Sequence, residues 1–130
     1  MNRQLPQWRS LLYVPASEER FVAKAHERGA DAIILDLKDG VAPDAKARAR
    51  AGLATSAASA RRNGADIVVR INRPLRMAAE DMAAAGAAGA DGLICTKMIG
   101  ADHVRCFPII PTQYCRAALS LAAKAVMFHS

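Results

Sequence analysis

The sequence predicts an α/β fold in which alternating strands and helices build a parallel sheet. Three apolar runs, at residues 32–35, 67–69 and 92–95, each follow a Gly-Ala-Asp triplet, and a fourth run lies at residues 11–14. The runs are short and do not alternate with polar residues, which is typical of strands buried on both faces. Helix-like stretches separate them, and this spacing predicts right-handed βαβ units.

Three helices are expected between these strands, because each intervening stretch carries helix signals. Ser17 is expected to cap a helix that ends near Arg28, with two Glu residues in its first turn. Asp44 is expected to cap an Ala- and Arg-rich helix over residues 45–62, and a third helix is expected over residues 77–88. The predicted order is therefore β-α-β-α-β-α-β.

The positions of polar residues distinguish the two architectures that use such units. A doubly wound sheet usually carries a glycine-rich phosphate turn after its first strand, but residues 14–17 read Val-Pro-Ala-Ser. A (β/α)8 TIM barrel keeps its functional groups at the C-terminal ends of its strands. Asp36 and Arg70 end two predicted strands, and Lys97 follows the last one. This pattern favours the barrel.

The length of the chain limits how much of a barrel it contains. A complete (β/α)8 barrel needs about 250 residues, whereas this chain has 130. We therefore expect residues 1–97 to form the N-terminal half of a TIM-barrel domain, about the first four βα units. No fifth triplet with a strand follows, and residues 98–130 are expected to form a divergent, helical tail, as in a truncated or frame-disrupted copy.

Composition and charge exclude several classes of protein. The net charge is +6, but the basic stretch over residues 45–62 has no interleaved aromatic residues, so a solvated helix face is expected there rather than nucleic-acid binding. No apolar run approaches the roughly 18 residues that cross a bilayer, and no signal peptide is recognised, so no membrane partner is expected. Three cysteines without metal-ligand spacing argue against a disulfide or zinc scaffold and favour a cytoplasmic location.

The candidate binding residues are the charged groups at the predicted strand ends. Asp36 and Asp39 flank Lys38; such carboxylates hold a metal-bound water, orient an arginine, or merely cap the next helix. Arg70 ends a buried strand, where its planar fork suits a ligand carboxylate or an ion pair with Asp36. Lys97 either neutralises an anion or is simply solvated. The residues themselves leave these alternatives open.

Three other residues with reactive side chains are expected to be structural. Glu80 and Asp81 lie in the third predicted helix, where carboxylates are usually solvated. Cys95 lies in a predicted strand and is expected to be a small buried hydrophobe rather than a nucleophile.

Several motifs together resemble one enzyme family. The segments Arg9–Pro15, Asp36–Pro43 and Val69–Asn72 are similar to the HpcH/HpaI aldolase and citrate lyase β-subunit family, with the malyl-CoA lyase branch the nearest. The pattern of Lys46 and Arg50 is also similar. The resemblance covers residues 9 to 97. The sequence departs from the family pattern at position 38, where a Lys replaces the usual Glu, and at residues 96–99, which replace Pro-Lys-Val-Glu.

The resemblance implies a fold, a reaction and a set of binding residues. Members are (β/α)8 barrels that cleave or form carbon–carbon bonds in 2-oxo or 3-hydroxy acids or their CoA thioesters, usually with Mg2+. Arg70 matches the arginine that binds the substrate carboxylate, and Asp36 and Asp39 match acidic positions at the mouth of the barrel. The family's Mg2+ ligands would lie beyond the matching region, so the motifs assign no metal ligand and no catalytic residue.

Two functions follow as hypotheses. The first is an aldol- or Claisen-type lyase in which Arg70, Asp36, Asp39 and Lys97 bind a small carboxylate or an acyl-CoA. The alternative is a non-catalytic remnant that acts only by association with another chain, because half a barrel has open sheet edges and an apolar inner face. A homo-oligomer or association with another chain is expected in either case.

Overall fold

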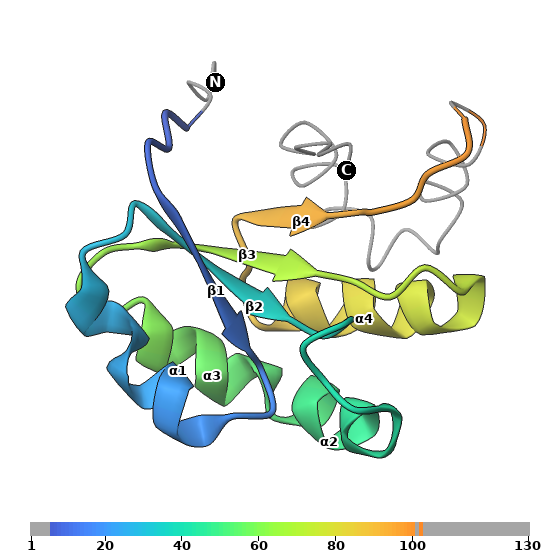
Figure 1. The fold of residues 1–130 in the computed structure, drawn as a ribbon, viewed down its shortest axis with the longest axis horizontal. Coiled ribbons are helices and arrows are strands. Elements are labelled where there is room, and N and C mark those ends of the chain that lie inside the picture. The colour runs from blue at the N-terminus through green and yellow to red at the C-terminus, as the bar shows by residue number, and fades with distance from the viewer. Residues whose placement is uncertain (1–5, 101, 103–130) are drawn as a thin grey trace.

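The computed structural model describes residues 6–100 and residue 102. Four strands alternate with helices along the chain (Figure 1). In order, the elements are β1 (Leu11–Pro15), α1 (Glu19–Ala25), β2 (Ala32–Asp36), α2 (Lys46–Ala51), α3 (Leu53–Ala60), β3 (Asp66–Arg70), α4 (Leu75–Ala87) and β4 (Gly92–Ile94), with 3-10 turns at His26–Arg28 and Pro43–Ala45. The α/β class predicted from the sequence is therefore confirmed.

The four strands form one parallel sheet in the order β1-β2-β3-β4, which is also their order along the chain. The helices lie on one face of this sheet (Figure 1). The register aligns Pro15 with Asp36 and Asp36 with Arg70, so the C-terminal ends of the first three strands are level with one another. The polar residues that end these strands are consequently brought to one edge.

Apolar side chains of β2, β3 and β4 are buried on both faces of the sheet, as their uninterrupted apolar sequences predict, whereas Tyr13 of β1 is half-exposed. Ile33, Leu35, Ile67 and Val69 face the helices and join the main core. The alternate positions Ala32, Ile34, Val68 and Ile94 form a second cluster on the opposite face, with Trp8 and Leu11 packed against it. Each strand side chain in both sets is at most 1% exposed.

The three Gly-Ala-Asp triplets have a common structural role at the N-terminal ends of the strands. Gly29, Gly64 and Gly89 have φ angles of +70°, +84° and +67°, in the left-handed region that side chains disfavour. Each glycine therefore lets the chain leave a helix or turn and enter the next strand. The internal repeat of the sequence marks these returns.

The aspartates of the first and third triplets bind the start of a neighbouring strand. Asp31 Oδ2 accepts hydrogen bonds from the backbone N–H groups of Arg9 and Ser10, at 2.8 and 3.1 Å. Asp91 Oδ2 accepts one from the Ile67 N–H at 2.9 Å. Backbone donors at the start of β1 and β3 are thereby satisfied.

Two predicted helix starts are wrong. The cap position of α1 is Glu18, not Ser17, and no side chain caps that helix. Asp44 lies within a 3-10 turn and caps nothing; a proline at the start of that turn sets its geometry instead. The predicted helix over residues 45–62 is divided at Gly52, whose ψ angle of 1° departs from the helical value.

The predicted helical tail lies largely outside the described residues. Of the expected segment 98–130, the structure describes residues 98–100 and residue 102, which contain no strand. Within the described part of the chain, no helix has both the length and the apolar character needed to cross a membrane.

Candidate carboxylate-binding site

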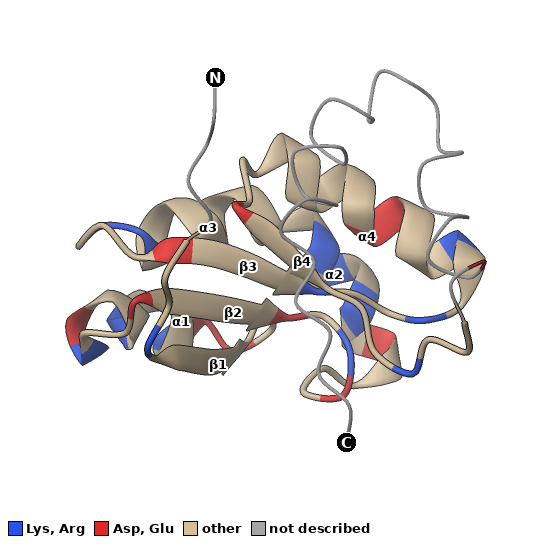
Figure 2. Ribbon diagram, turned by 90° about the horizontal axis from the view of Figure 1, so that it is seen from above, with Lys and Arg blue, Asp and Glu red and all other residues tan. Residues whose placement is uncertain are grey.

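The site lies where β2 and β3 end side by side. Asp36 is the last residue of β2 and Arg70 the last residue of β3, and the two are direct register partners. Neighbouring residues on parallel strands point to the same face of the sheet. Arg70 Nη1 accordingly lies 3.4 Å from Asp36 Oδ2. Charged residues continue into the loop that follows β2 (Figure 2).

Asp36 is a buried carboxylate, 4% exposed, that organises this loop. Its Oδ1 accepts the Lys38 N–H at 2.8 Å, and its Oδ2 accepts the Gly40 N–H at 2.9 Å. A Cβ at position 40 would lie 2.8 Å from Asp36 Oδ2, so only glycine fits there without a shift. Asp36 therefore orients the arginine and the loop, and does not cap the next helix.

Asp39 occupies the outer side of the same arginine. Its Oδ2 accepts hydrogen bonds from Arg70 Nη2 at 2.6 Å and Lys38 Nζ at 3.3 Å. Its side chain is 63% exposed. Partial burial would raise the pKa of Asp39, but the hydrogen bond and charge of Lys38, with the charge of Arg70, outweigh it and hold the pKa below its usual value.

The Arg70 side chain is mostly buried and only partly paired. Its guanidinium stands 5.7 Å from the centre of the Tyr13 ring, a cation–π distance. Its Nε is buried and, among the residues that the structure describes, has no hydrogen-bond acceptor. Buried donors without a partner are uncommon and costly. This arginine thus retains donor capacity beyond its two ion pairs.

A second layer of polar side chains holds the loops beneath the site. Lys46 Nζ donates hydrogen bonds to the Leu37 carbonyl at 3.0 Å, the Lys38 carbonyl at 2.5 Å and Asn72 Oδ1 at 2.8 Å. Asn72 Nδ2 also donates to the Leu37 carbonyl at 2.8 Å. These contacts join the loop after β2 to the segment after β3.

Asp81 anchors this layer and corrects the expectation of a solvated carboxylate. It is 0% exposed and accepts hydrogen bonds from Arg50 Nε at 2.7 Å and from the Asn72 backbone and side chain at 2.8 Å each. Glu80 is exposed, as expected, but pairs with Arg50 at 2.8 Å. The helix spacing contained the missed signal, because Asp81 shares one face of α4 with buried Ala78 and Ala85.

The expected solvated face of the basic stretch is also wrong at two positions. Lys46 and Arg50 point into the second layer rather than into water, and the Arg50 side chain is 18% exposed. The two residues that resemble the family pattern are therefore partly buried and paired in this chain. Arg48 is exposed, as expected for a solvated face.

Lys97 is not brought into this cluster. It is exposed and has a φ of +56°, and within the described part of the chain no hydrogen bond or ion pair joins it to Asp36 or Asp39. Cys95, close by, is partly buried, and this burial raises the pKa of its thiol to about 11. A thiol of that pKa is a poor nucleophile at neutral pH, in agreement with the structural role expected for it.

The carboxylates at the site do not form a magnesium site. Among the described residues, no group of three or more His, Cys, Asp or Glu side chains is placed to hold a metal ion. Asp36 is engaged by two N–H groups and Arg70, while Asp39 is engaged by two cations. A dication would have to displace these partners, so the donor set present does not fit Mg2+.

A family model covers most of the described chain. The model for the HpcH/HpaI aldolase/citrate lyase family matches residues 9–106. The chain belongs to this family. The match includes β1 to β4 and every residue of the Arg70 cluster, and it confirms the resemblance carried by the sequence motifs.

The chain is also similar to curated members of this family. It is 38% identical over 99 residues to a (3S)-malyl-CoA thioesterase from Cereibacter sphaeroides strain ATCC 17029, which covers 75% of this chain and 35% of the relative. It is 37% identical over 106 residues to the (3S)-malyl-CoA thioesterase of strain ATCC 17025, covering 81% of this chain and 37% of the relative. The chain therefore spans about a third of the length of the curated relatives it matches.

Proposed function

We propose that this chain provides the carboxylate-binding part of a carbon–carbon lyase that acts on a 2-oxo or 3-hydroxy acid or its CoA thioester. The observation that carries the proposal is the Arg70 guanidinium, which is held at the ends of β2 and β3 with unused donors. Asp36 fixes its position from the buried side. A planar arginine in such a setting suits bidentate binding of a carboxylate.

The proposed chemistry needs the positive charge that Arg70 supplies. In an aldol- or Claisen-type cleavage, the bond between the α-carbon and the hydroxyl-bearing carbon breaks as the hydroxyl gives its proton to a base. The hydroxyl-bearing carbon becomes a carbonyl, and the electrons of the broken bond form an enolate that is then protonated. A guanidinium that binds the carboxylate orients the scissile bond and stabilises nearby negative charge in a partly dry site. Lys97, exposed and separate from the cluster, remains a proposed contact for an outlying anionic group of the ligand.

The family resemblance implies Mg2+, but this proposal gives the described residues no part in binding it. The described residues do not fit the ion, because the carboxylates of Asp36 and Asp39 already have cationic partners. Its ligands would belong to strands beyond the matching region. The proposed roles of Arg70, Asp36 and Asp39 do not depend on the metal.

We also propose that the four βα units are part of a (β/α)8 barrel. Two observations support this: the strands are ordered as they occur in the chain, and their helices cover one face (Figure 1). A doubly wound sheet instead reverses its strand order and carries helices on both faces. In a barrel, Asp36 and Arg70 would line the mouth, where TIM-barrel enzymes keep their sites.

The carboxylate site is tested by ligand binding to matched arginine variants. Pyruvate or oxaloacetate at millimolar concentration, with Mg2+, is expected to raise the Tm of the wild-type chain. Arg70→Ala is expected to abolish this shift, and Arg76→Ala, which removes an exposed arginine paired with Glu80, is expected to retain it. A folded wild-type chain that shows no shift would contradict the proposal.

The reaction itself is tested with malyl-CoA, because the curated relatives bear the name malyl-CoA thioesterase. Carbon–carbon cleavage would release a 2-oxo acid and leave the shorter acyl-CoA thioester intact. Thioester hydrolysis would instead release free CoA thiol, which a thiol reagent detects. The first outcome supports the lyase, and the second contradicts it and indicates a thioesterase.

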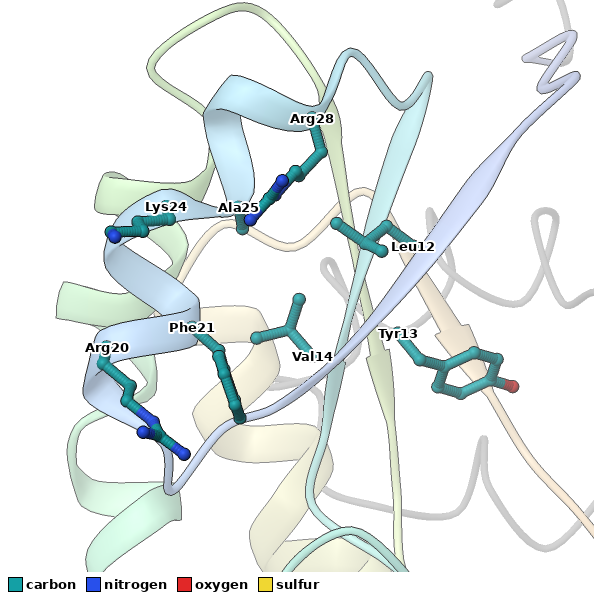
Figure 3. Close-up of a pocket in the computed structure, with 8 residues that line it drawn as sticks. All are labelled: Leu12, Tyr13, Val14, Arg20, Phe21, Lys24, Ala25 and Arg28. Carbon is teal, nitrogen blue, oxygen red and sulfur yellow. The ribbon is translucent and has the colours of Figure 1, made fainter.

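Association with another chain, without catalysis, is a second candidate. One observation favours it: a hollow of about 370 Å3 lies between β1 and α1, with Leu12 and Val14 at its base and Phe21 half-exposed at its side (Figure 3). In the described part of the chain, β1 pairs with β2 alone, so its outer edge is open. Light scattering after size-exclusion chromatography tests it; a monomer at all concentrations would contradict self-association.

A further inference from the structure

The contact between Arg70 and Asp39 leaves the arginine half satisfied. Nη2 of Arg70 donates to Asp39 Oδ2 at 2.6 Å, while the adjacent Nε has no acceptor among the described residues. Nε and Nη2 lie on the same side of a guanidinium and together form the fork that a carboxylate occupies with both oxygens. Asp39 uses one prong of that fork and not the other.

We propose that Asp39 occupies the Arg70 site as an internal carboxylate, which a ligand carboxylate must displace in order to bind. This inference rests on the proposed function, since it assumes that Arg70 binds a ligand carboxylate. It assigns to Asp39 the role of a competitor for the site rather than a contact for the ligand.

The two aspartates of the site differ in how firmly they are held. Asp36 is buried and accepts two backbone N–H groups in addition to Arg70. Asp39 is 63% exposed, and its carboxylate is held by two side chains, those of Arg70 and Lys38. Exposed ion pairs are weak, because water replaces each partner readily. Asp39 can therefore leave the arginine while Asp36 continues to position it.

Lys38 provides a second cation at the point where one carboxylate would replace the other. Its side chain is only 10% exposed, and its Nζ lies 3.3 Å from the same Asp39 oxygen that Arg70 binds. A ligand carboxylate in the place of Asp39 would meet both cations. Lys38, the residue that departs from the family pattern, is thus a specificity determinant for an anionic group at this point.

The test is pyruvate binding at pH 7, measured by calorimetry without added metal, for wild type and Asp39→Asn. Removing the competing charge is expected to tighten binding roughly 5- to 10-fold, because the site is then no longer occupied in the free protein. Asp39→Glu retains the carboxylate and is expected to bind within about 2-fold of wild type. The Tm of each variant verifies folding.

Two further variants separate local competition from a general change in charge. Asp31→Asn makes the same change in net charge at the opposite, N-terminal end of the strands, where Asp31 pairs with Arg9. It is expected to leave pyruvate affinity unchanged. In an Arg70→Lys background, Asp39→Asn is expected to give no gain in pyruvate affinity, because lysine lacks the two-pronged donor group of arginine.

The outcomes distinguish this inference from the function on which it rests. If wild type binds pyruvate and Asp39→Asn binds it equally or more weakly, Asp39 is not a competitor and the inference is overturned while the carboxylate site stands. If neither folded protein binds pyruvate, the carboxylate site is itself wrong and the inference falls with it. Equal tightening by Asp31→Asn would also overturn the inference, because the gain would then come from net charge.

Discussion

The two ends of the sheet use the same residue types for different purposes. At the N-terminal end, Asp31 and Asp91 accept backbone N–H groups at the start of β1 and β3, and each arrangement is satisfied within the chain. At the C-terminal end, Asp36 and Asp39 share one arginine whose Nε has no acceptor in the described structure. The aspartates at the N-terminal end thus have their hydrogen-bond partners, whereas the arginine at the C-terminal end has a donor without an acceptor among the described residues.

Under the proposed function, this difference separates an end of the sheet that serves stability from an end that binds the ligand. A folded protein normally satisfies its buried donors, and exceptions concentrate at functional sites. The incomplete end is also the end where TIM barrels place their sites. Substitutions at the N-terminal end should therefore alter stability alone, whereas those at the C-terminal end should also alter ligand binding.

The largest effect is expected at Asp81, which supports the C-terminal end from within the core. Asp81→Ala removes a fully buried carboxylate that accepts from Arg50 Nε and the Asn72 N–H, although Arg50 keeps its second pair with Glu80. Breaking a buried pair in this way costs about 3–5 kcal/mol of unfolding free energy. Urea denaturation measures it. The neighbouring variant Glu80→Ala, which removes an exposed carboxylate, should cost less than about 1 kcal/mol.

A smaller loss of stability, with a loss of binding, is expected at Lys46. Lys46→Met keeps the length of the side chain but removes hydrogen bonds to the Leu37 and Lys38 carbonyls and to Asn72. We expect about 2 kcal/mol of destabilisation and weaker pyruvate binding, because the loop that holds the Lys38 ammonium beside the Arg70 site is released. Unchanged pyruvate affinity, measured by calorimetry on the folded variant, would show that the loop keeps its position without this ammonium.

The strands were the part of the fold that the sequence predicted best. Their apolar runs are short, and the Gly-Ala-Asp triplets mark each return, so all four strands lie where the pattern indicates. The helix starts were harder to predict, because Ser17 and Asp44 have the chemistry of caps without the geometry. A residue type alone does not determine the backbone angles that make a capping hydrogen bond.

The site was predictable only where strand register determines it. Asp36 and Arg70 end adjacent strands, so their proximity follows from a parallel sheet. The environment of Asp81 depends on which face of α4 packs against the sheet, and Lys46 reaches the site across a loop. Neither contact follows from the separation of these residues in sequence.

The same substitution, glycine to alanine, can be made at each end of the sheet. Gly64→Ala at the N-terminal end places a side chain at a φ of +84° and should cost about 1 kcal/mol of stability with pyruvate affinity unchanged. Gly40→Ala at the C-terminal end places a Cβ 2.8 Å from Asp36 Oδ2 and should weaken pyruvate binding, because Asp36 must move from Arg70. Denaturation measures the stability of both variants, and calorimetry measures their pyruvate affinity. Equal pyruvate affinities would contradict the expected difference between the two ends.

The smallest effect is expected at the exposed pair of Arg9 and Asp31, and its dependence on pH lies in the acid range. The side-chain hydrogen bond from Arg9, with its backbone N–H, lowers the pKa of Asp31 to about 2. A carboxylate whose pKa falls on folding stabilises the fold above its unfolded pKa of about 3.9 and loses that contribution as the pH falls toward 2. Arg9→Ala should raise the pKa of Asp31 toward 3.9, which NMR titration of the side-chain carboxyl would detect. Pyruvate affinity at pH 7 should not change, since this pair belongs to the satisfied end of the sheet; a weakened affinity would show that the two ends are coupled.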